Sequence, residues 1–88
     1  MNREVALVTA DWCPTCKAME AWFDDVGIPG VTFRVEEVGW YQINGINLST
    51  VPTIFFIADG ETIQTVSGGM DKHSLIHAIL SLWPELKD

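Results

Sequence analysis

Both cysteines of this 88-residue chain lie in one short stretch, DWCPTCK at residues 11–17. A short β-rich run at residues 4–9 precedes it and predicts a buried strand. Pro14 is typical of the first turn of a helix, where its missing N–H needs no partner. Apolar residues at helical spacing follow, and Gly27 with Pro29 predicts the end of that helix. The cysteine pair is therefore predicted to lie at a strand-to-helix junction.

Residues 31–66 predict three further strands. Residues 31–36 alternate between apolar and polar side chains, which predicts a strand with one solvated face. Residues 53–57 and 62–66 predict a hairpin around a turn at Asp59-Gly60. The segment before this hairpin is ambiguous, with a short helix around Trp40–Ile43 and a loop as the expectation.

Gly68-Gly69 interrupts the regular secondary structure before a last helix, which Asp71 can cap. The apolar face of this helix is predicted to consist of Leu75, Ile76, Ile79 and Leu82. The element order is β-α-β-(α)-β-β-α, which predicts one α/β domain over residues 1–88 with a central mixed sheet flanked by helices. A crossover helix joins the first two strands, so these should be parallel. Three tryptophans are expected in the core, Trp22, Trp40 and Trp83.

Charge and length restrict the partners that this chain can have. Twelve acidic and five basic residues give a net charge of −7, which argues against nucleic acid or an anionic membrane as the main partner. The first apolar run is too short for the core of a signal peptide, and no stretch has the length of a membrane span. We therefore expect a cytoplasmic monomer, in which a close cysteine pair is catalytic or metal-binding rather than a structural staple.

The predicted position of the cysteines favours thiol–disulfide exchange. Unpaired N–H groups and the macrodipole at the start of a helix stabilise a thiolate at Cys13, and the thiolate is the nucleophilic form. Cys16, one helical turn later, can attack a mixed disulfide formed at Cys13. Trp12 offers apolar surface beside the nucleophile, while Lys17 offsets the opposing charge of Asp11.

Three motifs, in this order, resemble the thioredoxin superfamily. WCPTCK follows the first predicted strand, TVPT occupies residues 50–53, and two glycines follow Pro52 at the spacing that thioredoxins use, Gly60 and Gly68. The active-site strand VTADWCPTCK is similar to that of the thioredoxin-like C-terminal domain of membrane thiol–disulfide interchange reductases. The short N-terminus, TVP and GGMD are similar to glutaredoxins. The resemblance covers essentially the whole chain and implies a thioredoxin-like fold.

This resemblance implies a role for each matching residue. Cys13 would be the attacking thiol and Cys16 the resolving thiol, supported by Trp12, Pro14, Thr15 and Lys17. Pro52 would be a cis-proline, and the backbone of Val51 before it would pair with an extended substrate peptide. The substrate-binding residues would also include Gly68 and Gly69. Leu7 stands where thioredoxins carry a buried Asp that assists proton transfer.

These features predict a dithiol–disulfide oxidoreductase that reduces protein disulfides and so takes part in electron transport. It would bind no cofactor, and its redox-active group would be the Cys13–Cys16 disulfide. Electrons would come from a flavoprotein of the thioredoxin-reductase type. One alternative is a glutaredoxin-like protein recharged by glutathione, in which Asp71 holds the glutathione amino group; a plain helix cap is the preferred interpretation.

Two further interpretations are less specific. The fold can serve as a binding module with incidental cysteines, although such a module has no use for Trp12, Pro14 and Pro52 together. A metal site on the two cysteines would lack a second cysteine pair within the chain. His73 and His77 have a spacing that can bind metal, but they fall away from the apolar helix face and are expected to be solvated.

Overall fold

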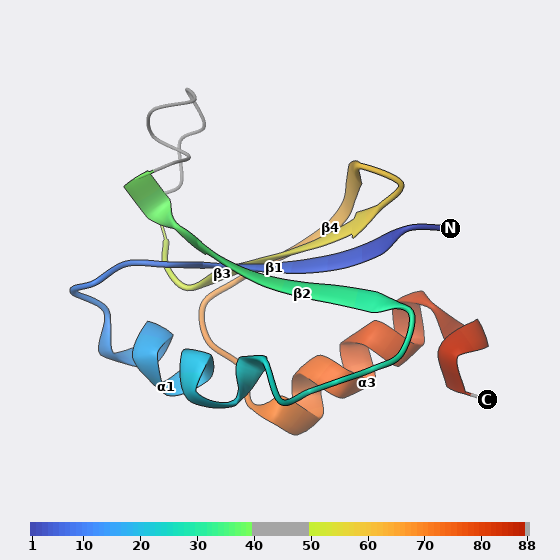
Figure 1. Ribbon diagram of the computed structural model, residues 1–88. Coiled ribbons are helices and arrows are strands. Elements are labelled where there is room, and N and C mark those ends of the chain that lie inside the picture. The colour runs from blue at the N-terminus through green and yellow to red at the C-terminus, as the bar shows by residue number, and fades with distance from the viewer. Residues whose placement is uncertain (40–49, 88) are drawn as a thin grey trace.

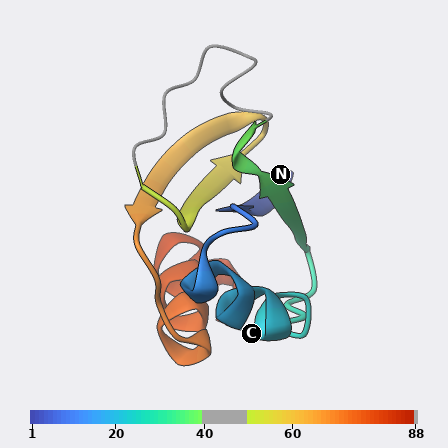
Figure 2. The same cartoon turned by 90° about the vertical axis from the view of Figure 1, so that its left-hand side faces the viewer.

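A four-stranded sheet in the order β2-β1-β3-β4 organises the molecule. This computed structural model describes residues 1–39 and 50–87. The strands are β1 (Arg3–Thr9), β2 (Val31–Glu37), β3 (Thr53–Ala58) and β4 (Glu61–Ser67). The helices are α1 (Pro14–Phe23) and α3 (Lys72–Leu82), followed by the 3-10 turn η1 (Pro84–Lys87). Both helices lie on the same side of the sheet (Figures 1 and 2).

The pairing of the strands follows from the connections between them. β1 and β2 are parallel, because α1 carries the chain back between them, whereas β3 pairs antiparallel with β1 and with β4. Asp59 and Gly60 turn the chain from β3 into β4 with φ angles of 52° and 84°. The predicted order and the mixed sheet of the thioredoxin-like fold are confirmed. Among the described residues, no helix is long and apolar enough to cross a membrane.

The larger apolar cluster fills the space between the sheet and the two helices. Its completely buried members are Val5, Leu7, Phe23, Ile54, Phe56, Leu75 and Ile79. The predicted inner face of α3 is therefore confirmed at its centre, while Ile76 and Leu82 are only partly buried. Trp83 is buried as expected and Trp22 packs at the edge of the cluster. The core assignment of Trp40 and the helix expected at 40–43 lie outside the described residues.

A smaller apolar cluster surrounds the two cysteines, and its other buried members are Val8, Ala10 and Val38. Successive side chains of a strand point to opposite faces, so Leu7 and Val8 enter different clusters although both are completely buried. Strand β1 is thus enclosed on both faces. The C-terminal end of β1 leads directly from the core to the turn that holds the cysteines.

Helix α1 is shorter than its apolar spacing predicts. It ends at Phe23, four residues before Gly27. Asp24 and Asp25 follow directly, and negative side chains are unfavourable at a helix C-terminus, where the macrodipole is negative. The amide of Asp25 donates to the carbonyl of Trp22 at 3.0 Å, which is the tighter spacing of a turn. The apolar spacing therefore continued beyond the helix itself.

Strand β2 alternates less regularly than predicted, because it lies at an edge of the sheet. Phe33 packs against the larger cluster, but Val35 on the same face is 38% exposed. On the other face, Arg34 is held between Glu4 at 3.2 Å and Glu36 at 2.6 Å. The expected contrast between a dry and a wet face is therefore only partial.

Candidate active site

Cys13 is the N-cap residue of α1. Its sulfur accepts a hydrogen bond from the backbone N–H of Cys16 at 3.1 Å. Its own amide donates to the carbonyl of Ala10 at 3.1 Å, which closes the turn between β1 and the helix. Pro14 occupies the first turn, where its missing N–H costs nothing. The sulfur therefore takes the place of the side-chain oxygen that usually caps a helix, and N–H dipoles point at it.

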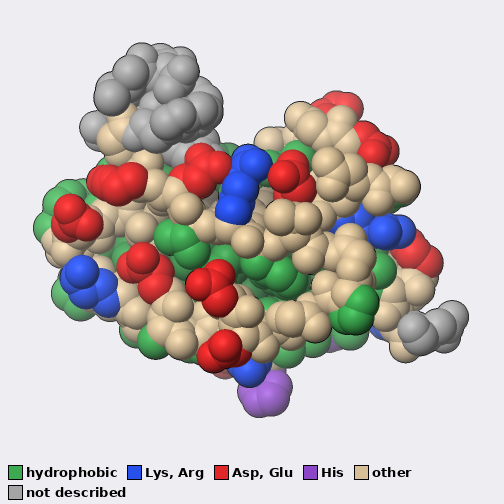
Figure 3. Space-filling model, viewed as in Figure 1, with side chains coloured by type: hydrophobic (Ala, Val, Ile, Leu, Met, Phe, Trp, Pro, Cys, Tyr) green, Lys and Arg blue, Asp and Glu red, His purple; other side chains and the backbone are tan. Residues whose placement is uncertain are grey.

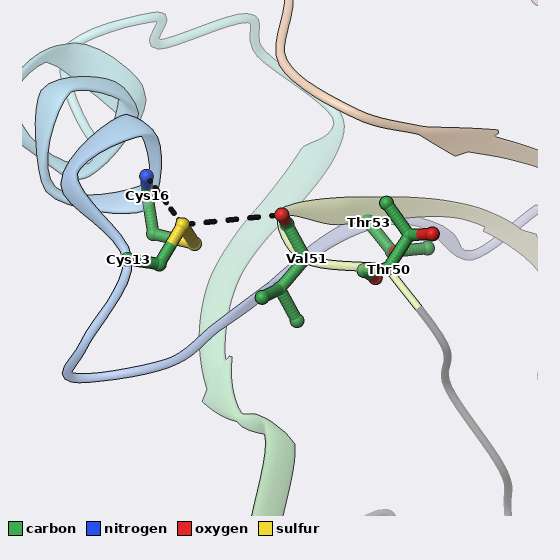
Figure 4. Close-up of a disulfide and its surroundings, with 5 residues drawn as sticks. All are labelled: Cys13, Cys16, Thr50, Val51 and Thr53. Carbon is green, nitrogen blue, oxygen red and sulfur yellow. Dashed lines mark hydrogen bonds between the residues drawn. A yellow bond between two sulfur atoms is a disulfide. The ribbon is translucent and has the colours of Figure 1, made fainter.

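The two cysteines form a disulfide with their Cα atoms 5.3 Å apart (Figure 4). Their surroundings differ. Cys13 is 6% exposed, whereas Cys16 is completely buried in the smaller cluster. A reagent from solution therefore meets the sulfur of Cys13 first.

The bend before β3 brings a backbone carbonyl to this disulfide. The Val51–Pro52 peptide bond is cis. The carbonyl oxygen of Val51 lies 3.9 Å from the sulfur of Cys13 and points toward it (Figure 4). The Thr53 hydroxyl donates to the carbonyl of Thr50 and closes the bend. Val51 is half-buried and Pro52 is buried, so the partly accessible side of this bend at Val51 lies beside Cys13.

The segment between β4 and α3 completes the surroundings of the cysteines. The amide of Gly68 donates to the carbonyl of Pro52 at 2.8 Å. Gly68 has a φ of +89°, a conformation that side-chain-bearing residues rarely adopt. Gly69 lies against Thr15 in the first turn of α1. Three segments that are distant in the sequence thus meet at the start of α1.

The predicted supporting residues lie on the surface around Cys13. Trp12 is 76% exposed, directly before the capping cysteine. Asp11 and Lys17 are exposed as well. Acidic side chains outnumber basic ones on the face that Figure 3 shows, in keeping with the net charge of −7. Trp12 therefore presents apolar surface directly beside Cys13.

The contacts of Asp71 and the burial of Leu7 bear on the roles predicted for these two residues. The Asp71 carboxylate accepts a hydrogen bond from the amide of Ser74 at 2.7 Å, so it caps α3 as expected. This bond holds the pKa of Asp71 below its usual value. Leu7 is completely buried, but it packs in the larger cluster, whereas both cysteines lie in the smaller one.

His73 and His77 are exposed on α3, as expected. Within residues 1–39 and 50–87, no group of three or more potential metal ligands is present. The apolar walls of the disulfide, Val8 and Val38, were not predicted from the sequence. Strand alternation could have indicated Val8, because it points away from Leu7.

Comparison with known proteins identifies the family. The thioredoxin family model matches residues 2–81. No match was found among the curated proteins. A mutant thioredoxin from Halobacterium salinarum is 26% identical, with a TM-score of 0.76. The thioredoxin Mala s 13 from Malassezia sympodialis is 28% identical, with a TM-score of 0.68. In both cases the match covers 91% of this chain and 74% of the other.

The matched region contains every element that builds the cysteine site, from β1 to the greater part of α3. The two matched structures share this fold and are thioredoxins, and the Cys-x-x-Cys pair stands at the start of α1. These findings support a thiol–disulfide oxidoreductase. The chain belongs to the thioredoxin family.

Proposed function

We propose that this protein reduces protein disulfides through a cycle of the Cys13–Cys16 pair between dithiol and disulfide. The unequal placement of the two sulfurs supports this most directly. Cys13 caps α1 and is partly accessible, whereas Cys16 is completely enclosed. The helix N-terminus favours a thiolate at Cys13, while apolar burial disfavours one at Cys16. Cys13 is therefore the attacking thiol and Cys16 the resolving thiol.

In the first step, the Cys13 thiolate attacks one sulfur of a target disulfide. A bond forms between these sulfurs, the target S–S bond breaks, and the released thiolate takes a proton. In the second step, Cys16 loses its proton and attacks the sulfur of Cys13. This breaks the mixed disulfide and releases the second target thiolate, which also takes a proton. The target has then gained a pair of electrons and two protons, and Cys13 and Cys16 are joined by a disulfide.

The target segment would dock on the surface beside Cys13. Val51 is half-buried, and its backbone lies next to the sulfur of the attacking Cys13, where it can pair with an extended peptide. Gly68 and Gly69 line the same side, and Trp12 offers exposed apolar area to the partner chain.

The oxidised pair needs two electrons to become a dithiol again. We propose that a cytoplasmic flavoprotein of the thioredoxin-reductase type supplies them. Glutathione is the alternative donor, with Asp71 as the ligand of its amino group. The bond from the amide of Ser74 explains Asp71 as a helix cap, so no glutathione ligand is needed to account for this residue. Comparing the rates at which NADPH with a thioredoxin reductase and glutathione reduce the oxidised protein distinguishes the two donors.

Covalent trapping with insulin, whose chains are linked by disulfides, tests the cycle and the division of roles. Cys16→Ser should accumulate a mixed disulfide with insulin, because the attacking thiol remains and the resolving thiol is gone. Cys13→Ser is the matched control and should accumulate almost none, since its remaining thiol is enclosed. Wild type should release reduced insulin. Equal trapping by both variants contradicts the assigned roles, and no reaction by any folded form supports the binding module instead.

A further inference from the structure

The segment that joins β4 to α3 passes very close to the first turn of α1. A β-carbon placed on Gly69 would lie 2.8 Å from Cγ2 of Thr15 and 3.9 Å from Sδ of Met19. Separations under 3.0 Å essentially never occur for real β-carbons, so a side chain at residue 69 requires a shift. The methyl group of Thr15 can lie where it does only because residue 69 has no side chain.

This contact is part of a chain of contacts that ends at the attacking sulfur. The amide of Gly68 binds the carbonyl of Pro52 at 2.8 Å. Residue 51, next to that proline, places its carbonyl oxygen 3.9 Å from the sulfur of Cys13. Thr15 lies between the two cysteines on the same helical turn. The segment at 68–69 therefore touches the cysteine turn on one side and is bonded to the loop at 51–52 on the other.

We propose that Gly69 is a positioning residue for Cys13, acting through the methyl group of Thr15. The inference rests on the proposed exchange function. With alanine at residue 69, the neighbours must separate by about 0.6 Å to restore the ordinary contact of 3.4 Å. Thr15 has few alternative side-chain conformations that would relieve the contact, because a β-branched side chain in a helix is confined to few rotamers. The displacement therefore passes to the start of α1 and moves Cys13 relative to the carbonyl of Val51.

The effect should appear in reactions that require alignment with a polypeptide. A displacement of this size should slow the reduction of insulin by about tenfold, because docking beside Cys13 depends on correct geometry. Alkylation of Cys13 by iodoacetamide needs no such docking and should stay close to wild type. A general loss of structure would change both rates, so their divergence identifies a positioning effect.

Four variants of the full chain test this: Gly69→Ala, Thr15→Ser, the double variant, and Gly39→Ala. Thr15→Ser keeps the hydroxyl and removes the methyl group, so it should restore insulin reduction in the double variant. Gly39→Ala is the matched control, because its new β-carbon would meet no atom closer than 4.0 Å. It should leave insulin reduction unchanged and report the general effect of replacing a glycine.

Insulin reduction by Gly69→Ala at the wild-type rate overturns the proposal, and so does a slow variant that Thr15→Ser does not restore. Wild type that fails to reduce insulin refutes the proposed function instead. In that case, the urea midpoints of unfolding of the same variants test the contact between residues 69 and 15. A midpoint of Gly69→Ala below that of Gly39→Ala, restored by Thr15→Ser, supports the steric contact through which Gly69 would act. Equal midpoints of the two alanine variants overturn it.

Discussion

Replacing Leu7 by aspartate should strongly destabilise the protein, although thioredoxins carry an acid at the corresponding place. Leu7 is completely buried, and its neighbours in the larger cluster are almost entirely apolar, such as Val5, Phe23 and Ile54. A carboxyl at residue 7 would lose the apolar burial of leucine and gain no assured hydrogen-bond partner. The expected cost is the sum of these two effects.

Complete burial of a leucine side chain contributes about 1.5–3 kcal/mol. A buried polar group without a partner costs about 1–3 kcal/mol more. Leu7→Asp should therefore lower the free energy of unfolding by about 2.5–6 kcal/mol even while the carboxyl is protonated. The total stability of a domain of this size is about 4–13 kcal/mol. The variant should accordingly be close to unfolding under mild conditions.

The loss of stability in Leu7→Asp should also grow as the pH rises. Burial raises the pKa of the introduced carboxyl in the folded state above its unfolded value of about 4. Below that pH both states hold the proton. Above it the unfolded state releases the proton and the folded state retains it, so stability falls by about 1.4 kcal/mol per pH unit up to the folded pKa. Leu7→Asn, which loses similar apolar surface but cannot ionise, should show a deficit that does not change with pH.

Urea unfolding of the oxidised proteins, followed by tryptophan fluorescence, measures both effects. The midpoints of wild type, Leu7→Asp and Leu7→Asn should be compared across the pH range from about 4 to 7, where the unfolded-state carboxyl ionises. A midpoint of Leu7→Asp equal to that of wild type at neutral pH refutes the assigned burial of β1. Identical pH dependence of the two variants refutes the expected pKa shift.

Substitutions at two further residues test contacts near the starts of α3 and η1. Asp71→Asn should keep the melting temperature near that of wild type, whereas Asp71→Ala should lower it, because only the amide can still accept from Ser74. The capping bond lowers the pKa of Asp71, so the advantage over Asp71→Ala should be present above pH of about 4 and lost as the pH falls. Glu85→Gln should lower the melting temperature by an amount that decreases at high salt, since Glu85 pairs with Arg3 at 2.7 Å. Equal melting temperatures of the two Asp71 variants contradict the cap, and a salt-independent Glu85→Gln effect contradicts the ion pair.

Local determinants made much of the fold and the cysteine site predictable. Pro14 directly after a cysteine marks the start of α1, and the cap bond at Cys13 depends only on residues within that turn. The hairpin turn at Asp59-Gly60 follows from residue types that tolerate positive φ. Asp71 three residues before the amide that it caps is a signal of the same kind.

Features that depend on distant segments were not predictable in this way. The exposure of Val35 depends on its strand lying at the edge of the sheet, which alternation along one strand does not reveal. The contact of Gly69 with Thr15 depends on how the loop after β4 approaches α1. The double glycine indicated an interruption of secondary structure, but no sequence signal predicted its contact with Thr15.

The unequal burial of the two sulfurs has a consequence for both directions of exchange. In the proposed cycle, attack on a target begins at Cys13, because the start of α1 favours a thiolate there and Cys16 is completely buried. In the oxidised protein, an electron donor also meets Cys13 first, because Cys16 is completely buried. Attack there makes Cys16 the leaving group. Its burial in an apolar cluster slows this step, but the same burial keeps the donor from attacking Cys16 directly. We therefore expect target and donor to form their mixed disulfides at the same sulfur, and to compete for the surface beside Trp12 and Val51.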